Sequence, residues 1–91
     1  MDSLNDIWQS ILNQLVESEQ LTTTAINIWF ADCQPVDLGD KRIVLSTTTD
    51  YKRGLMQQRF VPMLKKAFAD LFSLPDFEVV LLTAEEIGAA P

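Results

Sequence analysis

The spacing of the apolar residues limits the fold of this chain more than any other feature of its sequence. In three stretches these residues recur every three or four positions, which is typical of helices with one buried face; the stretches are 4–16, 26–33 and 51–72. Short runs at 36–38, 43–45 and 77–83 have the composition of strands. The order helix, helix, strand, strand, helix, strand predicts an α+β fold in which the helices cover a three-stranded sheet.

Polar residues and prolines mark where these elements begin and end. Ser3 is suited to cap the first helix, one of the threonines at 22–24 the second, and Thr49 or Asp50 the third. Pro35 should end the second helix, because the residue before a proline is driven out of the helical conformation. The sequence therefore predicts separate elements with short connections.

The arrangement of the strands and of the longest helix also follows from the sequence. The turn at 39–42 should join the first two strands in a hairpin. The run 79–82 is apolar on both faces, which predicts a buried central strand. Pro62 interrupts the longest helical stretch. We expect either a kink near residues 58–61 or two helices that meet there, with Pro62 in the first turn of the second.

Ninety-one residues are enough for one domain. We expect this domain to span residues 1–83, and residues 84–91 to form a tail or the start of a flexible linker. The single cysteine, Cys33, allows no internal disulfide, which is usual in a reducing cytosol. No apolar run approaches the roughly 18 residues of a membrane span, and the N-terminus lacks the features of a signal peptide. A cytoplasmic protein without membrane contact is expected.

The charges are segregated along the chain. All seven basic residues lie between Lys41 and Lys66, a stretch with one acid, Asp50. The first 40 and the last 25 residues carry the other twelve acids and no base. A fold that brings these segments together has a cationic face with acidic flanks. This pattern favours contacts with other macromolecules over chemistry at an active site.

Residues that catalysis and metal binding require are scarce. The chain has no histidine, and Cys33 is expected in the core, where free cysteines usually lie. Asp37 and Asp40 flank a turn and could touch a cation, but their role in the turn is the simpler account. The three glycines stand alone and make no phosphate-binding loop. We therefore predict no enzyme, no metal site and no cofactor.

Three groups of residues can act through contact. Trp8 either fills the core or lies at its rim as an interface anchor. The surface that joins the second helix to the third is either an ordinary half-buried flank or a docking patch for a partner; its residues are Ala25, Ile28, Trp29, Asp32, Tyr51, Lys52 and Leu55. Ile28 lies off the apolar stripe of the second helix, so we expect it to be at least partly exposed. The basic residues either form a solvated face or contact single-stranded DNA weakly; they are Lys52, Arg53, Arg59, Lys65 and Lys66.

The order of these features resembles the N-terminal domain of bacterial replication initiators of the DnaA family. The likeness covers about residues 4–83 and is carried by Ile7-Trp8, Ile11-Leu12, Leu15, Ile28-Trp29-Phe30, the Pro35–Leu38 step, the Ile43–Leu45 strand, Tyr51 and Phe60. It implies a KH-like α-α-β-β-α-β fold that lacks the nucleic-acid loop of KH domains. It also implies an interaction domain without catalysis, which self-associates, recruits the replicative helicase and binds initiation regulators.

The resemblance assigns roles to particular positions. Trp8, with Leu4 and Leu12 beside it, matches the self-association surface, and Tyr51 matches an aromatic residue of the helicase- and regulator-binding patch. Ala25 stands where some members have an acid, and Thr48-Thr49 where the family often has Pro-Asn. Two alternatives remain: a KH-like module that binds single-stranded nucleic acid, and an adaptor domain unrelated to replication.

Overall fold

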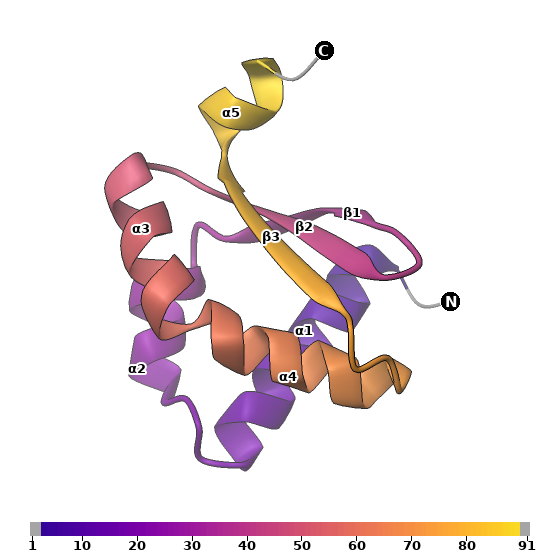
Figure 1. Ribbon diagram of the computed structural model, residues 1–91. Helices are drawn as coiled ribbons and strands as arrows, with labels where there is room; N and C mark the ends of the chain where they lie inside the picture. The colour runs from indigo at the N-terminus through magenta and orange to yellow at the C-terminus, as the bar shows by residue number, and fades with distance from the viewer. Residues whose placement is uncertain (1–2, 90–91) are drawn as a thin grey trace.

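The computed structural model describes residues 3–89 and confirms the α+β fold, with helices and strands in the predicted order (Figure 1). One additional short helix follows the last strand. The elements are α1 (Leu4–Glu17), α2 (Thr23–Ala25), the π-helix η1 (Ile26–Phe30), β1 (Gln34–Leu38), β2 (Arg42–Thr47), α3 (Asp50–Arg59), α4 (Val61–Phe72), β3 (Glu78–Thr83) and α5 (Ala84–Ala89).

The sheet has the order β1-β2-β3, with β2 in the centre. β1 and β2 form the predicted antiparallel hairpin, whose register shifts between Pro35 and Asp37. β3 runs parallel to β2, so the prediction that the third strand is central is wrong. β3 is apolar on both faces, but only one of its faces is buried. Its residues alternate between buried and half-exposed, and the half-exposed Val80 and Leu82 lie on the face that turns away from the core.

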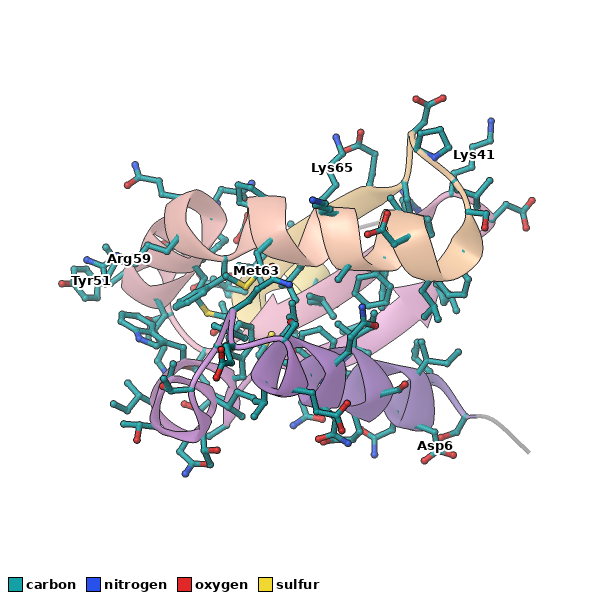
Figure 2. The ribbon with its side chains drawn as sticks, turned by 90° about the horizontal axis from the view of Figure 1, so that it is seen from below. Asp6, Lys41, Tyr51, Arg59, Met63 and Lys65 are labelled. Atoms are coloured by element: carbon teal, nitrogen blue, oxygen red, sulfur yellow. The ribbon has the colours of Figure 1, made fainter. Side chains whose placement is uncertain are left out.

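One layer of helices encloses the core against the other face of the sheet. Figures 1 and 2 show α1 and α4 side by side beneath the strands. Buried aromatic rings dominate this core, and Phe68 of α4 stacks on Phe77 with ring centroids 5.6 Å apart. The largest fully buried apolar side chains are Trp8, Phe68, Phe77, Ile11, Leu15, Ile43, Leu45, Met56 and Leu64.

The predicted caps are present. The Ser3 hydroxyl accepts a hydrogen bond from the Asp6 N–H at 3.1 Å, and the Asp6 carboxylate accepts one from the Ser3 N–H at 3.3 Å. Thr22 caps α2 by accepting from the Ala25 N–H at 3.0 Å. Thr49 caps α3 in the same way. Each cap supplies an acceptor to an amide that the helix leaves unpaired, and so fixes where the helix begins.

The longest helical stretch is split. α3 and α4 meet at Phe60, whose φ and ψ are −117° and −28°, and Pro62 lies in the first turn of α4. Of the two arrangements expected from the sequence, the second is confirmed. The Phe60 N–H still donates to the Met56 carbonyl at 2.8 Å, and its carbonyl accepts from the Leu64 N–H at 2.9 Å. The break therefore changes the direction of the chain without leaving these groups unpaired.

The second helix differs from the regular helix that its spacing predicts. It begins as a three-residue α-helix and continues as η1, which ends at Phe30. The Cys33 N–H then donates to the Phe30 carbonyl at 3.1 Å, and β1 begins at Gln34. The prediction that Pro35 ends the second helix is therefore wrong, because the helix ends five residues earlier. Pro35 lies inside β1, an edge strand, where its missing N–H is tolerated.

Helix α5 occupies residues 84–89, where the sequence led us to expect a tail or linker; residues 90–91 lie outside the described chain. The Glu86 carboxylate accepts a hydrogen bond from the Thr83 N–H at 3.0 Å, and the Thr83 hydroxyl accepts from the Glu86 N–H at 3.1 Å. This reciprocal pair caps the helix. The backbone hydrogen bond from Thr83 is the main cause that lowers the pKa of Glu86.

Candidate interaction surfaces

The structure brings together residues of the predicted docking patch. Asp32, in the turn after η1, forms an ion pair with Lys52 of α3, with the carboxylate and ammonium 3.0 Å apart. Ile28 is 56% exposed, as its place off the helical stripe led us to expect, and Tyr51 is 77% exposed. The ion pair therefore links two helical segments that each present a large apolar side chain to solvent.

Trp29 forms the floor of this surface. Its half-buried ring packs against Phe60, with centroids 5.8 Å apart and planes inclined by 53°. The guanidinium carbon of Arg59 lies 5.8 Å from the centre of the same ring, within the range of a cation–π contact. Arg59 thus belongs to this patch as well as to the basic group. The sequence contains a signal for this placement of Arg59. Tyr51, Leu55 and Arg59 follow one another at intervals of four residues on α3, so they lie on the same side of the helix.

The remaining members of the patch are less accessible. Ala25 packs against the hydrophobic core and is only partly exposed, and Leu55 is half-buried. We name the accessible part of the surface the aromatic knob and define it as Ile28, Tyr51 and Arg59. Tyrosine and arginine are residue types that dominate binding energy at protein interfaces, so the knob has the composition of a docking site.

Trp8 lies in the core and not at its rim. Its side chain is 1% exposed, and its ring lies 6.3 Å from that of Phe68 in a stacked arrangement. The indole Nε1–H donates to the Cys33 carbonyl at 3.3 Å. Leu12 is also buried, at 4%, whereas Leu4 is partly exposed. Of the two readings of Trp8, core packing is therefore correct.

This burial follows from the spacing within α1. Trp8 lies three residues before Ile11 and seven before Leu15, which places the three side chains on one face of the helix. Neither Trp8 nor Leu12 can contact a second copy directly while the domain is folded. Self-association through α1 would have to use other side chains.

A shallow cleft lies between the first half of α1 and the end of α4. It has a volume of about 290 Å³ and is lined by Asp6, Ile7, Ser10, Leu71 and Phe72. We name it the α1–α4 cleft. Leu71 is 45% exposed, although its spacing placed it on the buried stripe of the helix. Sequence reasoning missed this cleft, because nothing in the spacing separates Leu71 from its buried neighbours.

Most of the predicted basic face is neutralised by nearby acids. Lys65 pairs with Glu78 at 3.1 Å. Arg53 Nε lies 3.0 Å from a carboxylate oxygen of Glu86, although the orientation does not make a hydrogen bond, and 3.7 Å from one of Asp50. With Lys52 also paired, only two of the five candidates lack an ion pair within the described residues; they are Arg59 and Lys66.

Cys33 is a core residue, as predicted. Burial raises the pKa of its thiol to about 12, and the nearby charge of Lys52 lowers it by a smaller amount. The thiol is consequently neutral and unreactive at physiological pH. Within residues 3–89, no three side chains of histidine, cysteine, aspartate or glutamate converge on a point where a metal ion would fit. No helix in the same range has the length and apolar character to cross a bilayer.

Comparison with known proteins finds a similarity to a bacterial protein. No protein-family model matches the chain. The chromosomal replication initiator protein DnaA of Symbiobacterium thermophilum is 26% identical to it over 68 residues, which cover 75% of this chain. The aligned part is 14% of that protein, so the chain spans about a seventh of the length of this relative. The chain is thus similar to one segment of a replication initiator.

Proposed function

We propose that this chain is an interaction domain of a DnaA-type replication initiator. In this role it binds the replicative helicase and initiation regulators, associates weakly with other copies of itself, and works in the cytoplasm. The observation that carries the proposal is the aromatic knob, which presents Ile28 and Tyr51 to solvent on elements joined by the Asp32–Lys52 ion pair. The similarity of the chain to a segment of a replication initiator supports a role in the initiation of replication.

The knob favours protein binding for a physical reason. Exposed apolar side chains gain free energy when a partner removes them from water, by roughly 25 cal/mol for each Å² of apolar surface. Tyr51 lies on α3, whose start is fixed by the Thr49 cap, and Trp29 is held against Phe60. A surface supported in this way loses little conformational freedom on binding, which favours affinity.

The proposed contacts are individually weak and act together. One exposed tyrosine, one isoleucine and one arginine make a small interface by the standards of stable complexes, which bury about 1,600 Å² in total. Initiators assembled at one origin raise the local concentration of such domains, so that several weak contacts hold a helicase. Residues 1–83 would form this domain and the residues after them would lead toward the remainder of the initiator.

Binding of the purified replicative helicase to knob variants tests the proposal. Tyr51→Ala should weaken binding about tenfold or more, because truncation of an anchor residue costs over 1.4 kcal/mol. Since Tyr51 is 77% exposed, the melting temperature should stay near that of the wild type. Isothermal titration calorimetry measures the affinity for the helicase, and thermal unfolding measures the melting temperature.

Val36→Ala is the matched control, because Val36 is also exposed, at 45%, but lies on β1 in the sheet. This variant should bind the helicase as the wild type does. Unchanged affinity of Tyr51→Ala, or an equal loss in both variants, would remove the knob from the proposed interface.

A further inference from the structure

We propose that copies of this domain associate head to tail, with the aromatic knob of one copy seated in the α1–α4 cleft of the next. The inference rests on the proposed self-association and specifies its geometry. Within the described chain, four large apolar side chains are exposed, namely Ile28, Val36, Tyr51 and Leu71. Two of them form the knob and one lines the cleft, so these two surfaces hold most of the apolar area available to a second copy.

The two surfaces lie at opposite ends of the molecule. Figure 2 shows Tyr51 and Arg59 together at one end and Asp6, which lines the cleft, at the other. Figure 1 shows the same separation, with α2 and α3 at one end and the beginning of α1 and the end of α4 at the other. A knob therefore cannot reach the cleft of its own chain and can only meet that of another copy.

Charge selects this arrangement over a symmetric one. The knob carries Arg59. Asp32, which follows Ile28 in the sequence, pairs with Lys52, and Asp50, which precedes Tyr51, lies 3.7 Å from Arg53, a residue that also pairs with Glu86. The cleft carries Asp6, and the exposed Asp70 precedes Leu71; in the described structure neither forms an ion pair.

Three contacts between copies can then be compared. A symmetric contact between two clefts would bring the Asp6 carboxylates of both copies together. A symmetric contact between two knobs would oppose two copies of Arg59. Like charges that face each other across an interface are unfavourable. A knob placed in a cleft instead joins Arg59 to acids, and only this contact pairs opposite charges.

The size of the cleft agrees with a side chain as its occupant. Pockets for small-molecule ligands usually measure about 300–1,000 Å³. At about 290 Å³, with walls from Ile7, Leu71 and Phe72, the cleft lies at the bottom of that range. An aromatic side chain such as that of Tyr51 would cover its apolar walls while the phenolic hydroxyl remains near the polar Ser10 and Asp6.

A contact between two different surfaces leaves a free knob at one end of every complex and a free cleft at the other. Such heterologous contacts do not stop at the dimer unless the ring closes, and the two surfaces here lie at opposite ends of the domain. Self-association should therefore continue to trimers and longer chains as the concentration rises. A protein bound at the knob would end the growth of such a chain.

Complementation between two blocked variants tests this geometry by sedimentation velocity. Tyr51→Ala removes the knob and keeps the cleft, and Leu71→Lys fills the cleft with a cation and keeps the knob. We expect each variant alone to associate at least about tenfold more weakly than the wild type, as hot-spot losses do. An equimolar mixture should form one-to-one dimers with near wild-type affinity and nothing larger.

Val36→Lys is the control, since Val36 has the same 45% exposure as Leu71 and lies outside both surfaces. It should form chains as the wild type does. If only one of the two blocked variants loses association, the contact is symmetric and the inference is wrong. If the wild type associates but the mixture does not complement, the inference also fails, while the proposed self-association stands. A wild type that stays monomeric to millimolar concentration overturns both.

Discussion

At the scale of single residues, burial decides which aromatic side chains can bind a partner. Trp8 is enclosed by Phe30 and Phe68, whereas Tyr51 projects into solvent. We predict that Trp8→Ala lowers the free energy of unfolding by about 3–5 kcal/mol, because it leaves a cavity in the core. Urea denaturation measures the change, with Tyr51→Ala as the control, for which little change is expected.

This prediction separates two explanations of any loss of self-association in Trp8→Ala. If the variant unfolds as easily as we expect, lost association reflects lost structure. A Trp8→Ala variant with wild-type stability and no association would instead indicate that Trp8 contributes to the interface between copies.

The burial of Cys33 makes the stability of the domain depend on pH. Its pKa is raised from 9.0 to about 12 in the folded state because the thiol is buried. Above pH 9 the unfolded chain releases this proton and the folded chain retains it, so stability should fall by up to roughly 1.4 kcal/mol per pH unit. The contribution is fully present below pH 9. Denaturation at several pH values measures the slope.

Cys33→Ala serves as the reference, because it lacks the thiol and keeps every other titrating group. The difference in unfolding free energy between wild type and variant should be constant below pH 9 and should change above it. A difference that stays constant up to pH 11 would contradict the burial of the thiol.

Sequence reasoning located some contact residues and not others. The position of Ile28 off the helical stripe was enough to predict its exposure. The place of Trp8 was undecided, because a tryptophan near the start of a helix suits both the core and its rim. The exposure of Leu71 was not predictable, since it depends on how the beginning of α1 packs against the end of α4 and not on the spacing within α4.

At the scale of elements, α3 is weakened by a glycine that no neighbour requires. A methyl group added at Gly54 would meet no atom within 4 Å, and the residue lies inside the helix. We predict that Gly54→Ala raises the free energy of unfolding by about 0.5–1 kcal/mol, since alanine has a lower entropic cost in a helix. Thermal denaturation measures it.

Gly88→Ala is the matched control, because an added methyl group there also meets no atom within 4 Å. Gly88 lies near the end of the six-residue α5. A smaller gain is expected, since helix ends fray. Destabilisation by Gly54→Ala would show that α3 requires the glycine for a reason other than space.

The elements themselves were largely predictable, because their signals are local. Caps at Ser3, Thr22 and Thr49 and the break before Pro62 each depend on neighbours within a few residues. The edge position of β3 was not predictable in this way. Strand order depends on pairing between distant segments, and an apolar run that is half-exposed has the same composition as a buried one.

At the scale of the whole molecule, the fold compensates part of the charge that is segregated along the chain: within the described residues, three of the seven basic residues form ion pairs with acids from other segments or the next turn, namely Lys52, Arg53 and Lys65. Only Arg59 and Lys66 among the five candidate cations lack an ion pair in the described residues. If single-stranded DNA binds through these two alone, the logarithm of the binding constant should fall with the logarithm of salt concentration with a slope of about −1.4. Fluorescence titration of a labelled oligonucleotide measures the slope.

A slope near −3.5, which is about −0.7 for each of five contacts, would mean that all five cations reach phosphates. The ion pairs of Lys52, Arg53 and Lys65 would then have to open on binding. Such a result would favour a nucleic-acid-binding module. This molecular property could not be predicted from the sequence, because the pairing partners of Lys52, Arg53 and Lys65 include acids 13 to 33 residues away along the chain.

We propose that the aromatic knob is the surface through which this domain binds other proteins. Nuclear magnetic resonance of the isotope-labelled domain, titrated with the purified replicative helicase, tests it most directly. We predict that signals of Ile28, Tyr51 and Arg59 lose intensity first, while those of Val36 and Val44 on the sheet persist. Binding that broadens the sheet signals and leaves the knob unchanged would contradict the account.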